Sequence, residues 1–178
     1  MTGLHVVVMG VAGCGKSALG QRLAQALGLP LIEGDSFHPP ANVERMRQGL
    51  ALTDNDRAGW LSHLARELAG RPAGAVLTCS ALKRGYRDRL RAAVPGLRFV
   101  HLALDQQSAL ERVGLRAGHF YPPSLVASQF EALEDPSGEA GVVVVDALQP
   151  LDVAAVRALA GLAGTGSPWT DPPSIPGR

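Results

Sequence analysis

The sequence predicts an α/β fold in which a five-stranded parallel sheet is covered by helices on both faces. Two observations lead to this prediction. Five short apolar segments alternate along the chain with longer segments whose apolar residues recur at helical spacing, and such alternation is typical of parallel sheets between helical layers. The first apolar segment, residues 5–9, leads through a glycine-rich turn into an amphipathic segment, residues 18–27, in the order strand, turn, helix.

The glycine-rich turn has the spacing G-x-x-x-x-G-K-S, which is typical of a loop that binds nucleotide phosphates. Its glycines let the backbone point several N–H groups inward, and the following helix adds the positive end of its dipole. Lys16 supplies a cation for the outer phosphates, and Ser17 supplies a hydroxyl ligand for Mg²⁺. The residues predicted to bind the nucleotide through this loop are Gly10, Val11, Ala12, Gly13, Cys14, Gly15, Lys16 and Ser17.

Two other interpretations of this turn compete with the first. Residues 13–18 also fit the pattern G-x-G-x-x-A of a dinucleotide-binding fold, and Asp35 lies about 20 residues on, where a ribose ligand would sit. The turn could also be a connection that binds nothing. The pair Lys16-Ser17 favours a nucleoside triphosphate, because a pyrophosphate held by backbone groups alone does not need that pair. ATP and Mg²⁺ are therefore the expected ligands.

The composition excludes several classes of protein. A chain of 178 residues is long enough for one domain with a proper core. A net charge of +1 gives no bulk attraction to nucleic acid or to an anionic membrane. The N-terminus lacks the basic region and cleavage site of a signal peptide, and no apolar run approaches the ~20 residues that span a bilayer. Cys14 and Cys79 are isolated, so reduced thiols and a cytoplasmic location are expected.

The remaining elements are expected in order along the chain. Acidic residues after Thr53 predict the start of a helix, and Asp105 predicts another. The β-branched run 142–145 fits a strand that is buried on both faces. The expected strands are 31–33, 75–79, 97–104 and 142–145, and the expected helices are 41–48, 53–69, 83–93, 105–116, 124–133 and 151–163.

Two segments interrupt this pattern. Residues 117–122 contain glycine and proline between two helices, and we expect a lid near 114–123. Residues 164–178 hold four prolines and show no periodicity, so they are expected to form a disordered tail. The predicted organisation is one domain over residues 1–163, lid included, followed by the tail 164–178.

Ligands of such sheets bind beyond the carboxyl ends of the strands, so polar residues that follow a strand are candidates for the site. Asp35 follows the second strand, where it could accept a proton from a substrate hydroxyl, orient Mg²⁺ through water, or only stabilise a turn. Lys83 follows the third strand, and only it and Lys16 are lysines among 17 basic residues. His38 and His119 lie in turns and are suited to hydrogen bonds with a polyhydroxylated substrate.

Two pairs of arginines complete the candidates. Arg45 and Arg57 lie on the segment expected to overhang the site, where they bind an anionic acceptor or form solvated surface pairs. Arg112 and Arg116 are four residues apart and share one helix face. This second pair could clamp the transferring phosphoryl group, or it could simply complement the helix dipole.

With these residues placed, the chain resembles the small, bacterial-type gluconate kinases of the P-loop superfamily. The resemblance covers residues 5–160, and G-D-x-x-H-P, C-S-A-L-K-x-x-Y-R and G-H-F are its specific motifs. The matching segments are Met-Gly-Val-Ala-Gly-Cys-Gly-Lys-Ser (9–17), Gly-Asp-Ser-Phe-His-Pro (34–39), Asn-Val-Glu-Arg-Met (42–46), Leu-Thr-Asp-Asn-Asp-Arg (52–57), Trp-Leu (60–61), Cys-Ser-Ala-Leu-Lys (79–83), Tyr-Arg-Asp (86–88), Gly-His-Phe (118–120) and Ser-Gln-Phe-Glu (128–131).

The resemblance implies a nucleoside-monophosphate-kinase-like fold, usually a homodimer, that uses ATP and Mg²⁺ to make 6-phosphogluconate from gluconate. Lys16, Asp35 and Arg116 are then the catalytic residues, and Arg112 joins Arg116 at the ATP phosphates. Cys14 stands where a serine is common, and Gly114 stands where a basic residue is often seen. The residues assigned to the substrate, with Arg87 and Gln129 added by the resemblance, are Asp35, His38, Arg45, Arg57, Lys83, Arg87, His119 and Gln129.

Two other functions are weighed against gluconate phosphorylation. A related small-molecule kinase such as shikimate kinase shares the phosphate loop and an aspartate after the second strand, but the expected G-E-x-x-F-R run is absent here. A regulatory module would bind ATP without phosphorylating a metabolite. Asp35 together with a dedicated lid favours an enzyme with an acceptor substrate.

Overall fold

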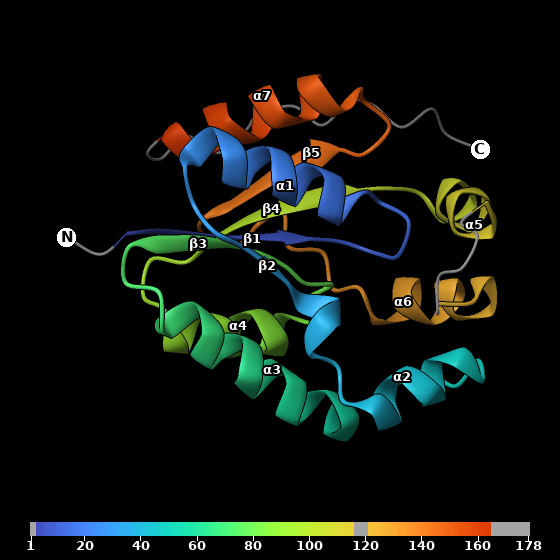
Figure 1. The fold of residues 1–178 in the computed structure, drawn as a ribbon. Coiled ribbons are helices and arrows are strands. Elements are labelled where there is room, and N and C mark those ends of the chain that lie inside the picture. Colours follow the sequence, from blue (N-terminus) through green and yellow to red (C-terminus); the bar gives the residue numbers. More distant parts are fainter. Residues whose placement is uncertain (1–2, 116–120, 165–178) are drawn as a thin grey trace.

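Five strands form one parallel sheet, as the sequence predicts (Figure 1). The computed structural model describes residues 3–115 and 121–164. The strands pair in the order β2-β3-β1-β4-β5, each parallel to its neighbours, so their carboxyl ends lie at one edge of the sheet. The strands are β1 (Leu4–Met9), β2 (Leu31–Glu33), β3 (Gly74–Thr78), β4 (Arg98–Ala103) and β5 (Val142–Asp146).

Helices cover both faces of this sheet (Figure 1). On one face pack α1 (Lys16–Leu27) and α7 (Leu151–Ala163), and on the other pack α3 (Asp54–Ala69) and α4 (Arg84–Ala93). Three shorter helices lie at the edge where the strands end, and they are α2 (Pro40–Arg47), α5 (Gln106–Gly114) and α6 (Val126–Ala132). The carboxyl edge of the sheet is therefore the edge around which the connecting segments gather.

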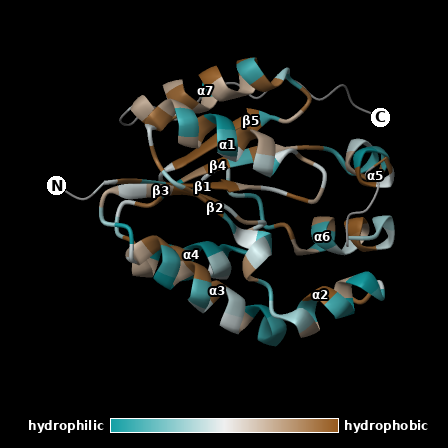
Figure 2. Ribbon diagram, in the orientation of Figure 1, coloured by the Kyte–Doolittle hydropathy of each residue, from teal (hydrophilic) through white to brown (hydrophobic). Residues whose placement is uncertain are grey.

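The central strand β1 explains why the strands have continuous apolar sequences. Val6 and Val8 pack into a cluster with α1 and α7, whereas Val7 and Met9 pack into a second cluster with α3 and α4. All four side chains are fully buried. A strand between two helical layers has no solvated face, so apolar and polar residues do not alternate along it. Figure 2 shows hydrophobic residues concentrated on the strands, whereas α2, α3 and α4 carry many hydrophilic residues.

The helix boundaries follow the predicted capping residues. Thr53 and Asp56 form a reciprocal capping box at the start of α3, and the Asp105 carboxylate accepts the backbone N–H of Ser108 at the start of α5. Both contacts satisfy N–H groups that the first turn of a helix leaves unpaired. The helix predicted over 105–116 is shorter in the structure, because α5 ends at Gly114, a residue of low helix propensity.

Irregular segments account for the other differences in the described chain. The predicted turn after β2 contains a 3₁₀ helix, Gly34–Phe37, and the predicted helix 124–133 begins with a 3₁₀ turn, Pro123–Leu125. Residues 116–120 of the expected lid and 165–178 of the expected tail lie outside the described residues, so the division at 163 stays a prediction. Within the described ranges, no helix has both the length and the apolar character that crossing a membrane requires.

Candidate active site

The loop between β1 and α1 has the backbone geometry that its glycines predict. Gly10, Gly13 and Gly15 have φ angles of 144°, 81° and 98°, values that residues with a Cβ rarely adopt. The Lys16 ammonium donates to the carbonyls of Gly10 (3.1 Å) and Val11 (3.0 Å), so it lies folded over the loop. The cation predicted for the outer phosphates is therefore at the loop and held by contacts that a phosphate can replace.

Cys14 contributes its backbone to this loop rather than its thiol. Its side chain is buried, and burial raises the pKa of the thiol above its usual value. A Cβ on Gly10 would lie 2.8 Å from the Cys14 sulfur and from the Leu102 carbonyl oxygen. The turn at Gly10 therefore requires glycine for space as well as for its φ angle.

Ser17 meets a carboxylate that the sequence analysis did not single out. Its hydroxyl donates to Oε2 of Glu33 at 3.0 Å, and the Thr78 hydroxyl donates to the same oxygen at 2.7 Å. These oxygens come from the ends of β2 and β3 and from the start of α1. A hydroxyl and a carboxylate are the hard oxygen donors that Mg²⁺ prefers, and Mg²⁺ keeps several of its waters. The residues present therefore fit that ion.

A cavity opens beside the phosphate loop and extends to the residues that follow β2. Loop residues Ala12, Gly13 and Gly15 form one end of its lining, together with Lys16 and Ser17. The rest of its lining includes Asp35, His38, Met46, Leu52, Arg57, Trp60, Ser80, Tyr121 and Gln129. One cavity therefore brings the predicted phosphate site together with the predicted catalytic aspartate, one histidine and one arginine.

Trp60 of α3 holds the segment that carries Asp35 and His38. Its indole N–H donates to the Gly34 carbonyl at 2.8 Å, and the His38 ring stacks on the indole at a centroid distance of 4.2 Å. A Cβ on Gly34 would lie 2.1 Å from the Thr78 carbonyl oxygen, so β3 and this turn touch through glycine. Asp35 thus occupies a position that is fixed by a buried tryptophan and a close backbone approach.

His38 lines the cavity with a half-buried imidazole. Its Nδ1 is buried and has no hydrogen-bond partner among the described residues. Burial lowers the pKa of His38, an effect that Asp35 opposes and Arg57 assists. The ring is therefore neutral at pH 7, and a neutral imidazole can donate to or accept from a hydroxyl.

Arg57 also lines this cavity, whereas Lys83 and Arg45, which were assigned to the substrate as well, lie outside its lining. The Arg57 guanidinium donates to the Leu52 carbonyl at 2.6 Å and lies 3.5 Å from the Tyr86 hydroxyl. Lys83 instead pairs with Asp54 at 2.7 Å, and this hydrogen bond raises the pKa of Lys83. Arg45 forms an ion pair of 3.5 Å with Asp56.

Gln129 and Arg112 reach the phosphate loop itself. The Gln129 side-chain oxygen accepts the Ala12 backbone N–H at 2.6 Å. The Arg112 guanidinium donates to the Gly13 carbonyl at 3.4 Å and to the Ala147 carbonyl at 3.0 Å. The structure therefore places Arg112 beside the predicted phosphate site. Arg116 and His119 lie outside the described residues.

The assignment of Arg87 to the substrate requires a correction, because Arg87 does not line this cavity. Arg87 belongs to α4, and its side chain is fully buried and pairs with Glu139. Tyr86, its neighbour in the matching segment, is the residue whose hydroxyl points to Arg57 and Asp54. Successive residues on a helix point in directions about 100° apart, so a sequence motif on α4 does not reveal which member faces the site.

Comparison with known proteins identifies relatives for most of the chain. The AAA domain family matches residues 6–135. The gluconokinase of Gluconobacter oxydans (strain 621H) is 46% identical over 151 residues, which cover 83% of this chain and 85% of that protein. The thermosensitive gluconokinase of Escherichia coli (strain K12) is 41% identical over 150 residues, which cover 82% of this chain and 80% of that protein.

A solved structure shows the same likeness in three dimensions. The crystal structure of a gluconokinase from Sinorhizobium meliloti 1021 superposes with a TM-score of 0.83 at 50% sequence identity. The superposition covers 90% of this chain and 91% of that one. The arrangement of strands and helices around the cavity is therefore shared with that protein over nearly its full length.

Proposed function

Since this chain belongs to the gluconokinase family, we propose that it transfers the γ-phosphoryl group of ATP to the 6-hydroxyl of D-gluconate. The products are 6-phospho-D-gluconate and ADP. The observation that carries this proposal is the cavity lined at once by Lys16, Ser17, Asp35, His38 and Arg57. A phosphate site and a carboxylate that accepts a proton have to share one enclosure for a hydroxyl to attack a phosphoryl group.

The phosphate loop holds the triphosphate in this proposal. The N–H groups of Gly13 and Gly15 bind phosphate oxygens, and Lys16 leaves the carbonyls of Gly10 and Val11 to bind the outer phosphates. Ser17 and Glu33 would hold Mg²⁺, Glu33 either directly or through water. When bound, the ion neutralises charge on the phosphate oxygens.

Asp35 accepts the proton of the attacking hydroxyl. The 6-oxygen of gluconate forms the new bond to the γ-phosphorus, and the bond from that phosphorus to the β–γ bridging oxygen breaks. The hydroxyl proton moves to the Asp35 carboxylate as the new bond forms, because the attacking oxygen becomes far more acidic once it bonds to phosphorus. Asp35 lines the cavity together with Lys16, which supports this division of roles.

His38 and Arg57 bind the acceptor. The neutral His38 imidazole, which lines the cavity, hydrogen-bonds a hydroxyl of the sugar acid. The Arg57 guanidinium complements an anionic acceptor such as the gluconate carboxylate. Arg45 and Lys83 support the same end from outside the cavity lining, through their ion pairs with Asp56 and Asp54.

A lid closes over the phosphates in this proposal. Arg112 already contacts the Gly13 carbonyl of the loop, and the chain beyond α5 leads to Arg116 and His119. Arginines that reach the phosphates stabilise charge that develops during transfer, and closure excludes water that would otherwise hydrolyse ATP.

The test is a coupled assay of ADP release, run with gluconate, with shikimate, with a panel of other sugar acids and with no acceptor. We expect ADP release that depends on gluconate and on Mg²⁺. Release that depends on shikimate would make the protein a kinase of another acceptor. ATP binding without any acceptor-dependent release would favour the regulatory module instead.

The cellular setting is part of the same proposal. We place the enzyme in the cytoplasm as a homodimer, without a nucleic-acid or membrane partner. The two cysteines of the chain, Cys14 and Cys79, are free and buried, which is consistent with a reducing compartment. Light scattering after size-exclusion chromatography gives the mass of the assembly, and a monomer at working concentration would contradict the dimer.

A further inference from the structure

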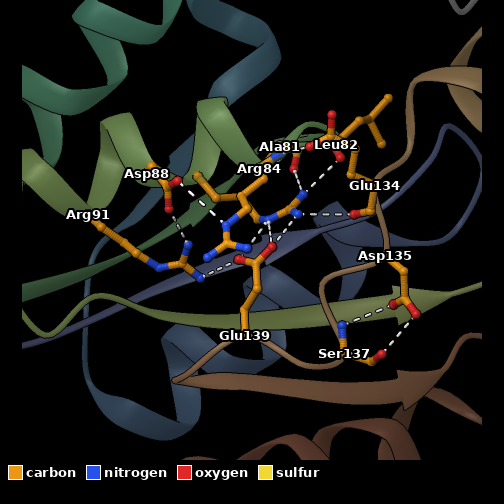
Figure 3. Close-up of polar contacts among 10 residues, drawn as sticks. Ala81, Leu82, Arg84, Asp88, Arg91, Glu134, Asp135, Ser137 and Glu139 are labelled. Carbon is orange, nitrogen blue, oxygen red and sulfur yellow. Dashed lines mark hydrogen bonds and ion pairs between the residues drawn. The ribbon is translucent and has the colours of Figure 1, made fainter.

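Arg87 is a fully buried arginine for which the proposed reaction has no direct use. A guanidinium has five N–H donors, and here all of them find acceptors. Nε and Nη2 bond the Glu139 carboxylate, Nη2 also donates to the Glu134 carbonyl at 3.0 Å, and Nη1 donates to the carbonyls of Ala81 and Leu82 at 2.8 Å each. Figure 3 shows these acceptors converging from different segments of the chain.

The acceptors belong to two segments that are far apart in the sequence. Ala81 and Leu82 lie in the loop between β3 and α4, whereas Glu134 and Glu139 lie between α6 and β5. These segments also bond each other, since the Glu134 N–H donates to the Leu82 carbonyl at 2.9 Å. Arg87 therefore lies at the junction of two loops and bonds the backbone of both.

The loop from β3 to α4 touches the phosphate loop. Ser80 lines the cavity, and its carbonyl accepts the Gly10 N–H at 3.3 Å. The next residue, Ala81, has a φ of 45°, which costs energy for a residue with a Cβ. The Nη1 contact at the Ala81 carbonyl holds the residue in this conformation, and so it holds the orientation of the Ser80 carbonyl.

The segment from α6 to β5 reaches the same loop by another route. Gln129 of α6 accepts the Ala12 N–H through its side chain, and α6 ends at Ala132, two residues before Glu134. The Glu134 carboxylate in turn accepts the Arg84 N–H at the start of α4. The loop after β3 thus bonds Gly10 of the phosphate loop directly, whereas the loop after α6 follows the helix whose Gln129 bonds Ala12.

We propose that Arg87 is a positioning residue of the transfer reaction. It joins the loop after β3 to the loop after α6, and through Ser80 and through Gln129 of α6 these segments keep Gly10 and Ala12 in position. This role rests on the proposed function, because its readout is turnover. A lysine keeps the charge but cannot reproduce a planar fork that serves four acceptor groups at once. Arg87→Lys should therefore disturb the geometry of the loops even in a folded protein.

The test compares Arg87→Lys with Arg91→Lys. Arg91 lies one helical turn further along α4 and donates to Oε2 of Glu139 at 2.7 Å, but no contact joins it to Ala81, Leu82 or Glu134. Turnover is measured well below the melting temperature of each variant, so that both proteins are folded. We expect kcat of Arg87→Lys to fall by about tenfold or more, as a misplaced reacting group requires, and kcat of Arg91→Lys to stay within about twofold.

Chemical rescue separates positioning from stability. Guanidinium, at concentrations far below those that unfold the protein, should restore part of the kcat of folded Arg87→Ala and leave that of Arg91→Ala unchanged. If Arg87 variants do not fold, Glu139→Gln decides, because it keeps an acceptor oxygen and removes the charge that anchors the guanidinium. A wild-type kcat in folded Arg87→Lys or in Glu139→Gln would overturn the proposal.

Failure of the proposed function would look different. In that case the wild-type protein itself would show no gluconate-dependent release of ADP. The affinity of each variant for ATP, measured by calorimetry without an acceptor, stays available as a second readout. Altered ATP affinity in Arg87→Lys, with wild-type affinity in Arg91→Lys, would then still support the link between Arg87 and the phosphate loop.

Discussion

The Ser17 hydroxyl donates a 3.0 Å hydrogen bond to the Glu33 carboxylate. This bond joins the first turn of α1 to the last residue of β2, and the same Glu33 oxygen also accepts the Thr78 hydroxyl at 2.7 Å. The carboxylate is therefore oriented by two hydroxyls that lie next to the phosphate loop. Groups that orient a metal ligand affect metal affinity even when they do not bind the ion themselves.

Replacing Glu33 should weaken the response to Mg²⁺. In Glu33→Gln, the amide loses the charge that attracts the ion and orients Ser17, so half-maximal activity should need about tenfold more Mg²⁺ or higher. Activity is measured as a function of Mg²⁺ at saturating ATP and gluconate. Glu111→Gln, on α5, serves as the control. An unchanged Mg²⁺ titration in Glu33→Gln would remove Glu33 from the site.

Removing the Lys16 ammonium should nearly abolish turnover. In Lys16→Ala the backbone N–H groups still bind phosphate, but no mobile cation follows the charge that develops on the outer phosphates. We expect kcat to fall by about 10²–10³-fold or more. The coupled assay measures this loss, and calorimetry tests whether nucleotide binding persists. A wild-type kcat in this variant would show that the Lys16 ammonium has no catalytic role.

Asp35→Asn should separate binding from chemistry. The amide keeps the size of the side chain and part of its hydrogen bonding, but it does not accept the proton of the hydroxyl. ATP binding should persist, while gluconate phosphorylation falls by about 10²–10⁴-fold. Asp152→Asn, on the solvent side of α7, is the control. Near-normal turnover with normal Mg²⁺ dependence would return Asp35 to the role of a turn residue.

His101 should make the stability of the protein depend on pH. Burial lowers its pKa to about 4, so the unfolded chain, in which histidine has a pKa of about 6.5, binds the proton more tightly. The contribution to stability is fully present above about pH 6.5 and is lost progressively as the pH falls toward 4. The shift corresponds to about 3 kcal/mol at the acid end.

Thermal unfolding between pH 7.5 and 5 measures this effect. His101→Leu removes the titrating group, so its melting temperature should fall less steeply with acid than that of the wild type. His63→Leu is the matched control, because that imidazole lies half-exposed on α3. Equal slopes for the wild type and His101→Leu would show that another group causes the acid sensitivity.

Local spacing is sufficient to predict the part of the site that one segment builds. Lys16 and Ser17 follow the glycines directly, and Asp35 follows a strand whose bounds, 31–33, were predicted from the sequence. Glu33 was missed, because it is the last residue of a short strand and its contact with Ser17 depends on how α1 packs on β2. Only the folded chain brings these two residues together.

Arg87 illustrates the opposite error. Its motif on α4 placed it at the substrate, but the side of the helix on which it lies faces Glu139 and two loop carbonyls. The direction of a single side chain depends on the rotation of the helix about its axis, which the packing of Leu90 into the core determines. Sequence patterns predict that rotation for apolar residues better than for a buried charge.

The most direct test of the account is the position of the phosphate in the product. The purified protein is incubated with ATP, Mg²⁺ and gluconate, and the product is analysed by phosphorus–proton correlation NMR. The account predicts one phosphate ester whose phosphorus couples to the two protons on carbon 6, and a strongly reduced yield in Asp35→Asn. An ester on a secondary carbon, or no ester while ATP is consumed, would contradict it.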